Sequence, residues 1–429
     1  MIKILVINEV GPEIKNHRTS ILFEKMIPIL LKKNEIKVFW LSYDYKKNES
    51  QIDTPYELLH IHEFKNAKEV VEKIEPDLIY VLPGLSLIDY AFLLTARILK
   101  IPTFGYIDGI GVFTHRKINY KKQLKVMLNE SYIKKETYGN NSEFKAVNYF
   151  KKHLFLIRSM RKNRSTFKYI ISEIIKIFKL YFQPMTFQEN ERYTKFTCDL
   201  LLIENELSID SACKHGLSKN KMKVVGDPTY DLAFSEKHIE EDRDKNRKIN
   251  VLFVTSNFTG GQGELEWSIQ KQLRMIKELV EEYQNNFKKI KLKIKIHPVS
   301  EVYSDYEKVL KKYNTDIQIS QYDDIFGLIR DADVIICPSA STAGLIALIM
   351  KKPIIVWNYF NIQGDAFLKE KITMNCKNIS EIKDCIDNRI NFIQENELII
   401  NNYIKKFCGE GNASQKCADA VNELILKIK

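Results

Sequence analysis

Three hydroxyl side chains interrupt an apolar stretch near the end of the chain. Ser339, Ser341 and Thr342 stand between ADVIICP, which has the composition of a strand, and GLIALIMKK, which has the composition of a helix. Unpaired amides at a helix N-terminus, the positive end of its dipole and hydroxyl donors together make an anion site. An ordinary N-cap accounts for one of these hydroxyls but not for three. The turn therefore predicts phosphate binding.

A second candidate is TSNFTGGQGELEW, residues 255–267, which follows an apolar run. Its glycines let backbone amides approach an anion, and its polar side chains can donate to that anion. A plain loop is an equal alternative, because the stretch matches neither G-x-G-x-x-G nor the Walker pattern. The nucleotide-binding candidates here are Thr255, Ser256, Asn257, Gly260 and Gly261.

A third candidate is the dipeptide His297-Pro298, which ends an apolar run with alternating lysines. Pro298 cannot donate to a sheet ladder and so ends the strand. His297 is then either a half-buried edge histidine or an imidazole that donates to a phosphate. The residue types by themselves do not decide between these two interpretations.

The first half of the chain offers one acid at a similar position. Asp108 lies in GYIDGIGVF, between the apolar run PTFGYI and two glycines. Asp-Gly is a common turn pair, and a turn is the simpler reading. If the ligand cleft lies there, Asp108 is placed to accept a proton from an acceptor hydroxyl, as a general base must.

Short β-branched runs that alternate with longer amphipathic stretches must position these residues. Near-continuous apolar strands of this kind indicate parallel sheets with helices on both faces, whose ligands bind at the carboxyl ends of the strands. The expected strands are 2–8, 36–43, 78–83, 102–108, 199–205, 249–257, 291–298, 332–338 and 353–358.

The length of 429 residues fits two domains, and the strand pattern restarts after the charged stretch 235–248. We expect an α/β chain of two Rossmann-like doubly wound parallel-sheet domains. The first spans 1–235 and carries a basic helical insertion at about 116–195. The second spans 249–400, and a helix at 401–429 is placed to pack back on the first domain.

The net charge of +11 is concentrated in one segment. Residues 116–182 contain 17 Lys or Arg and 4 Glu, a local charge of +13, so the rest of the chain carries −2. Basic and aromatic residues at helical spacing suggest a helix on an anionic membrane surface, with a candidate patch of Lys168, Lys176 and Lys179. A helix packed on the protein's own core is an equal alternative. No recognition motif supports nucleic acid as a partner.

Other classes of protein lack their signals in this sequence. No apolar stretch is long enough to span a membrane, and the N-terminus lacks a secretory signal. The seven scattered cysteines form no C-x-x-C pair. The expected setting is the cytoplasm, with the inner face of the cell membrane as an option. Because H-E-x-x-H and cysteine clusters are missing, we expect no metal.

Together these motifs resemble bacterial GT-B glycosyltransferases that build surface polysaccharide. The acidic-Gly, HP and P-S-x-S-T-A-G-L motifs are similar to those of bacterial sialyltransferases and capsular Kdo transferases, which use CMP-activated sugars without a metal. The resemblance implies Asp108 as base and His297 as the ligand that stabilises the leaving phosphate. It also implies that the second-half hydroxyls cradle the nucleotide phosphate. VVGDPTYD, residues 224–231, resembles the segment before the second domain in these enzymes and in related epimerases and glycerophosphotransferases.

Two positions depart from the family pattern. Ile107 replaces the first of two acidic residues, which weakens the base assignment. Many UDP-sugar enzymes carry a Glu after a glycine to hold the ribose, whereas this chain has Gly344, Leu345 and Ile346. The missing Glu favours a cytidine donor over a uridine or guanosine donor.

The sequence thus predicts an inverting, metal-independent glycosyltransferase without a cofactor. Its expected donor is a CMP-linked nonulosonic acid or Kdo, and its expected acceptor is a surface glycan or a lipid-linked glycan. Alternatives within enzymes are a UDP-sugar hexosyltransferase, a nucleotide-sugar 2-epimerase and a CDP-glycerol-type transferase. An alternative outside enzymes is a non-catalytic, membrane-associated partner of a polysaccharide-synthesis complex.

Overall fold

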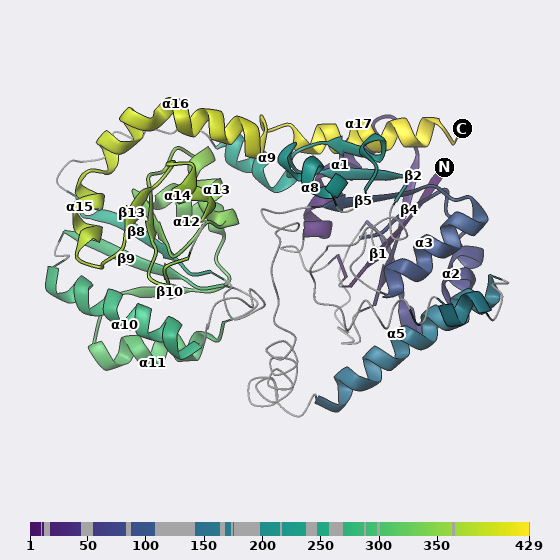
Figure 1. Ribbon diagram of the computed structural model, residues 1–429, viewed down its shortest axis with the longest axis horizontal. Coiled ribbons are helices and arrows are strands. Elements are labelled where there is room, and N and C mark those ends of the chain that lie inside the picture. The colour runs from purple at the N-terminus through teal and green to yellow at the C-terminus, as the bar shows by residue number, and fades with distance from the viewer. Residues whose placement is uncertain are drawn as a thin grey trace. The chain divides into compact units, whose positions relative to one another are not determined.

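The computed structural model divides the chain into two compact units (Figure 1). The first contains Met1–Thr229 and Asn412–Lys429, and the second contains Tyr230–Gly411. The structure describes residues 1–9, 11–12, 18–43, 55–82, 87–107, 142–163, 168–172, 175, 198–214, 217–236, 247–256, 269–286, 289–297, 301–362 and 365–428.

The first unit is built on a parallel sheet of seven strands in the order β3-β2-β1-β4-β5-β6-β7. Apolar residues alternate between its faces along β1, so that Ile4 and Val6 face one side and Leu5 and Ile7 the other. The strands are β1 Ile2–Asn8, β2 Ile36–Ser42, β3 Glu57–His60, β4 Leu78–Tyr80, β5 Thr103–Ile107, β6 Leu200–Ile203 and β7 Met222–Val224.

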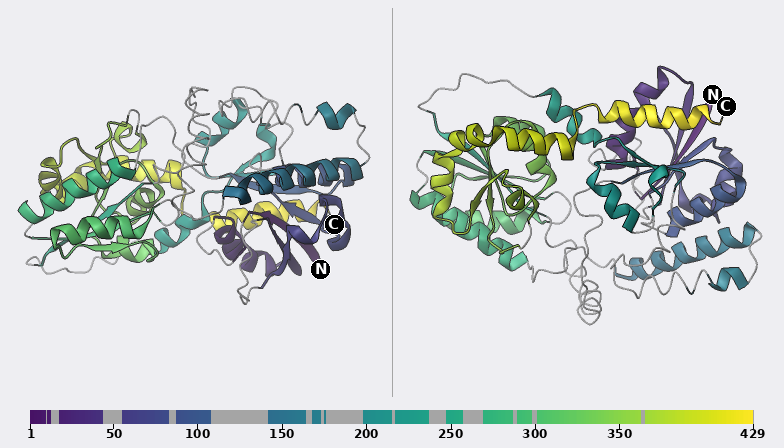
Figure 2. Two further views of the ribbon diagram at one scale, coloured as in Figure 1. Left: turned by 90° about the horizontal axis from the view of Figure 1, so that it is seen from below. Right: turned by 45° about the horizontal axis from the view of Figure 1, so that its top comes forward.

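Helices cover both faces of this sheet, as parallel strands joined by helical crossovers require (Figure 2). Side chains of α1 Arg18–Leu31 and α17 Ala413–Leu426 pack on the Ile4 face, and those of α2 Ala67–Ile74, α3 Leu87–Leu99 and α5 Ser142–Lys162 pack on the Leu5 face. The first unit also contains α8 Leu207–Lys214 and short 3₁₀ turns at Ile61–Glu63 and Lys219–Lys221. Helix α9 Pro228–Ser235 begins at the end of this unit, and its residues from Tyr230 onward belong to the second.

The second unit has a six-stranded parallel sheet in the order β10-β9-β8-β11-β12-β13. The strands are β8 Ile249–Val254, β9 Ile290–Lys295, β10 Gln318–Ser320, β11 Val334–Cys337, β12 Ile354–Trp357 and β13 Met374–Cys376. Two apolar cores lie on its two faces. The helices are α10 Ile269–Asn286, α11 Tyr303–Tyr313, α12 Ile325–Asp331, α13 Thr342–Ile349, α14 Ala366–Lys369, α15 Glu381–Asp387 and α16 Arg389–Cys408.

The predicted fold class is confirmed: both units are parallel-sheet α/β domains, and every strand expected from the sequence is present. Four further strands, β3, β7, β10 and β13, were not expected, and they form the outer edges of the two sheets. Each has only three or four residues, which is too short for a periodic apolar signal.

The chain returns to the first unit through a break between α16 and α17. Gly409 and Gly411 adopt positive φ angles of 82° and 79°, which glycine reaches without steric cost. Beyond the break, Asn34 Nδ2 donates to Asn422 Oδ1 at 2.8 Å, and Lys33 Nζ donates to Asp419 Oδ1 at 3.1 Å. These bonds tie α17 to the end of α1.

Part of the expected basic insertion is described. Helix α5 buries Phe155, Leu156 and Met160 in the core of the first unit, so this helix packs on the protein itself. Residues 168–172 are also helical, and Lys168 is exposed, whereas Lys176 and Lys179 lie outside the described residues. Within the described part of the chain, no helix is both long and apolar enough to span a membrane.

Candidate functional site

The candidate site is built at the carboxyl edge of the second sheet. Strands β8, β9, β11 and β12 end at Val254, Lys295, Cys337 and Trp357, and polar residues follow each of them. Because all these strands are parallel, their following loops meet at one edge, where ligands of open α/β sheets bind.

The hydroxyl turn lies between β11 and α13. Ser341 is the N-cap of α13, and its Oγ accepts from Gly344 N at 3.2 Å. Ser339 is buried, and its Oγ lies 3.4 Å from Ser256 Oγ, which follows β8. Thr342 is the first residue of α13. The N-cap reading therefore holds for Ser341, while the structure brings Ser256 and Ser339 together from two adjacent strands.

Asp365 fixes this turn from the opposite side. Its Oδ2 accepts from Ala340 N at 2.6 Å, and its Oδ1 accepts from Phe367 N at 3.0 Å, where it caps α14. Gly344 lies against the same helix, since an added Cβ would stand 2.4 Å from Cε2 of the Phe367 ring. The absence of a side chain at position 344 thus allows α13 and α14 to pack closely. Asp365 is not among the predicted site residues, although an aspartate before a short apolar segment is an N-cap signal.

The loop that follows β9, residues 296–302, contains the His297-Pro298 dipeptide and is called the HP loop. The structure describes its residues 296, 297, 301 and 302. The backbone N–H of His297 donates to Thr255 Oγ1 at 3.0 Å and to Glu301 Oε2 at 2.6 Å. Burial lowers the pKa of the His297 imidazole, and the nearby Lys295 lowers it further. The ring is therefore neutral at neutral pH and offers one N–H donor and one acceptor.

Glu301 is the centre of a buried polar network beneath this loop. Only 5% of its surface is exposed. Besides the His297 N–H it accepts from Thr255 Oγ1 at 2.6 Å and from Gln272 Nε2, and Gln272 Nε2 also donates to Tyr306 OH at 2.7 Å. Burial raises the pKa of the Glu301 carboxyl, and these hydrogen bonds oppose the rise. The network fixes the backbone from which the His297 side chain projects.

Lys295 and Gln321 complete the support of the loop. Lys295 is 7% exposed, and its Nζ donates to Gln321 O at 2.6 Å and to Ile296 O at 3.1 Å. Gln321 Nε2 in turn donates to Glu301 O at 2.9 Å. Burial lowers the pKa of the Lys295 ammonium. The Lys295 side chain therefore stabilises the backbone of the HP loop through these hydrogen bonds.

The other residues singled out from the sequence are described only in part. Thr255 lies at the edge, but its hydroxyl donates to Glu301, which makes it part of the loop support. Ile107 is the last residue of β5 and is buried. Asp108, Asn257, Gly260, Gly261 and Pro298 lie outside the described residues.

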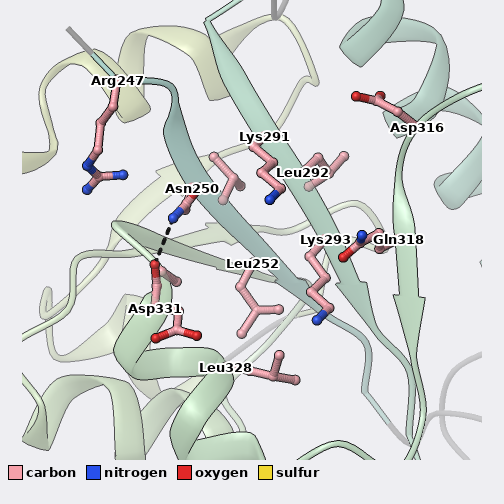
Figure 3. Close-up of a pocket in the computed structure, with 12 residues that line it drawn as sticks. Arg247, Asn250, Leu252, Lys291, Leu292, Lys293, Asp316, Gln318, Leu328 and Asp331 are labelled. Atoms are coloured by element: carbon pink, nitrogen blue, oxygen red, sulfur yellow. Dashed lines mark hydrogen bonds between the residues drawn. The ribbon is translucent and has the colours of Figure 1, made fainter.

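A groove of about 740 Å³ lies at the other end of the second sheet, over the amino ends of β8 and β9 (Figure 3). Lys291, Lys293, Asp316 and Asp331 are among its lining residues. Lys293 Nζ lies 3.5 Å from an oxygen of Asp323, so part of its charge is balanced. Because its lining carries both signs of charge and includes the amino ends of the strands, this groove does not match the predicted phosphate site.

The described residues contain no group of three or more His, Cys, Asp or Glu placed to hold a metal ion.

Comparison with known proteins identifies the fold. No protein-family model matches the chain, and no curated protein matches it. Among solved structures, the wall teichoic acid polymerase TagF is similar, with a TM-score of 0.56 and 12% identity over 99% of this chain and 89% of that one. A putative UDP-N-acetylglucosamine 2-epimerase from Listeria monocytogenes gives 0.53 and 12% over 99% and 97%.

The S. aureus MnaA structure with UDP gives a TM-score of 0.51 and 13% identity, over 100% of this chain and 98% of that one. At such low identities the likeness concerns the fold alone. The chain therefore has the two-domain, parallel-sheet fold shared by GT-B glycosyltransferases and UDP-N-acetylglucosamine 2-epimerases.

Proposed function

We propose that this protein is a transferase that uses a nucleotide-activated donor and binds the donor phosphate at the carboxyl edge of the second sheet. The proposal rests on the convergence of donors at that edge. Ser256 and Ser339 lie side by side, α13 begins beside them, and the HP loop is fixed on the adjacent strand. Amides at a helix start and fixed hydroxyls are the groups that bind phosphate.

The loops around the candidate site lack cationic residues, which supports a donor with a single phosphate. No Lys or Arg occurs in 255–268, 296–302, 338–341 or 358–365, the loops that follow β8, β9, β11 and β12. A diphosphate donor places two negative charges at the phosphate site, whereas a sugar linked through a single phosphate places one there, so a diphosphate site gains more from cationic side chains. We therefore propose a CMP-linked sugar, with nonulosonic acid or Kdo as the sugar class.

The helix at the site is consistent with this choice. Leu345 and Ile346, where many UDP-sugar enzymes hold the ribose with a Glu, are 1% and 2% exposed and belong to the core. In the proposed reaction, the acceptor hydroxyl attacks the anomeric carbon, Asp108 takes its proton, and the bond to the phosphate oxygen breaks. His297 donates its N–H to the leaving phosphate, which is inverting chemistry that needs no metal.

The test is calorimetric titration with CMP, CDP, UDP and GDP in buffer without divalent metal. We expect CMP to bind most tightly and Ser339→Ala to weaken it. Ser380→Ala, an exposed serine before α15 without a side-chain capping bond, is the matched control. Tightest binding of UDP would instead favour a hexosyltransferase or epimerase, and tightest binding of CDP a CDP-glycerol-type enzyme.

Absence of binding to all four nucleotides would contradict the proposal and favour a non-catalytic partner of a polysaccharide-synthesis complex. Where CMP binds, incubation with CMP-linked sugars and a surface-glycan or lipid-linked acceptor, followed by product analysis, tests transfer. Unchanged turnover in a chelator is expected for the metal-independent reaction.

A further inference from the structure

Two thiols of the second unit lie within reach of a covalent bond. Cys376 ends β13 and is fully buried, and Cys385 lies on α15 and is partly buried. Their Sγ atoms are 3.1 Å apart. A disulfide has an S–S length of about 2.05 Å, so the sulfurs need to approach by only about 1 Å.

The turn between the two cysteines holds them in this arrangement. Glu381 Oε2 accepts from Lys377 N at 2.8 Å, and its Oε1 accepts from Asn378 Nδ2 at 2.9 Å. These bonds fix the start of α15 relative to the end of β13. The segment between the two cysteines thus holds their sulfurs in contact, about 1 Å from bonding distance.

The two thiols are chemically unequal. The hydrogen bond between them lowers the pKa of Cys385 and raises that of Cys376, while burial and the carboxylates of Glu381 and Asp384 act to raise the pKa of both. The thiolate, which is the reactive form of cysteine, is thus favoured at the partly exposed sulfur. An oxidant from solvent meets Cys385 first, with Cys376 held behind it.

We propose that Cys376 and Cys385 form a dithiol site that hydroperoxides oxidise to a disulfide. The Cys385 thiolate attacks a peroxide oxygen, the O–O bond breaks, and Cys385 becomes a sulfenic acid as hydroxide leaves and takes up a proton. The Cys376 sulfur then attacks the Cys385 sulfur, and the S–O bond breaks to release water that carries the Cys376 proton. In sum, two thiols lose two electrons and hydrogen peroxide becomes two waters.

The site adjoins the loop that follows β12. Cys376 O accepts from Asn358 N at 2.9 Å, and the Asn358 side chain bonds both the N–H and the carbonyl of Ile362, at 2.7 and 3.3 Å. A disulfide would thus tether the strand on which this loop rests. The oxidation itself does not depend on the proposed transferase activity.

The test treats the full-length protein with hydrogen peroxide, alkylates it under denaturing conditions and digests it with trypsin. We expect two of the seven cysteines to escape alkylation and a disulfide to join peptides ITMNCK and DCIDNR, residues 372–377 and 384–389. The yield should not change on tenfold dilution of the protein, because closure is intramolecular. Dithiothreitol should reverse it.

Matched variants separate this site from general thiol oxidation. Cys385→Ser should abolish the protection, whereas Cys213→Ser, which removes an exposed thiol on α8, should leave it unchanged. Cys376→Ser should leave a sulfenic acid at Cys385 that dimedone traps. Full alkylation of Cys376 and Cys385 at a peroxide dose that already oxidises Cys213 would overturn the proposal. Oxidation of Cys385 to sulfinic acid without a linked peptide would overturn it as well.

Discussion

Replacement of Glu301 tests whether a buried acid supports the HP loop. In Glu301→Ala, the His297 N–H and the Thr255 hydroxyl lose their carboxylate acceptor. A buried donor without its partner costs about 1–3 kcal/mol. Thr255 Oγ1 can still accept from His297 N and turn toward Lys295 O, 3.4 Å away, which reduces this loss. We expect the free energy of unfolding of the second unit to fall by roughly 2–4 kcal/mol.

The pH dependence of Glu301→Gln is a sharper test, because the amide keeps the size of the side chain and removes its charge. Burial raises the folded-state pKa of Glu301 above its ordinary value of 4.5. An acid with a raised folded pKa favours the folded state when protonated. That contribution is complete below the unfolded pKa and is lost as pH rises through the folded pKa. Each unit of separation between the two pKa values contributes about 1.4 kcal/mol.

The assay is urea unfolding at several pH values between neutral and the ordinary carboxyl pKa, followed by tryptophan fluorescence. Buried Trp357 reports the second unit. We expect wild type to gain stability over Glu301→Gln as pH falls. Glu395→Gln, at an exposed position on α16, is the control and should change stability by less than about 0.5 kcal/mol. A wild type that loses stability relative to Glu301→Gln on acidification would show that hydrogen bonds outweigh burial, and would refute the reasoning.

Three further predictions concern packing, catalysis and the basic segment. Gly344→Ala should lower the free energy of unfolding by about 1–3 kcal/mol, because its Cβ meets the Phe367 ring, and Phe367→Leu in the same chain should restore part of the loss in a urea titration. His297→Ala should lower the transfer rate by roughly 10²–10³ with circular dichroism unchanged, and full activity would contradict its role. Replacement of the exposed residues Arg161, Lys162 and Lys168 by Glu should weaken co-sedimentation of the protein with anionic vesicles. Unchanged co-sedimentation would exclude a membrane role for these three residues.

The central strands were predictable because burial on both faces makes them continuous apolar runs. In β11 and β12 every residue is buried, and their sequences VIIC and IIVW show it directly. Edge strands receive no such signal. Side chains of β10 and β7 are partly exposed, and strands of three residues carry no measurable period. Their places in the sheets depend on pairing with strands distant in sequence.

Candidate site residues were predictable where a polar residue directly follows a strand. They were not predictable where a residue of one loop stabilises the backbone of another. Ser339 and His297 were found from their position after apolar runs. Glu301 and Asp365 act on the backbone of other segments, since Glu301 meets Thr255 46 residues earlier and Asp365 meets Ala340 25 residues earlier. Such contacts arise only when the sheet aligns its loops. A motif search along the chain therefore finds candidate residues that follow a strand, and misses residues such as Glu301 and Asp365 that hold the backbone of other loops.

The absence of Lys and Arg from the four loops after β8, β9, β11 and β12 leads to a last prediction. If neutral hydroxyls, amides and a neutral imidazole hold the phosphate, little of the binding free energy is Coulombic attraction that salt screens. The affinity for CMP should then change by about threefold or less between roughly 0.05 and 0.5 M NaCl, over which the screening length shortens severalfold. Calorimetry at both salt concentrations measures this. A loss of tenfold or more would mean that cationic side chains from elsewhere contact the phosphate, and would remove the charge argument for a single-phosphate donor.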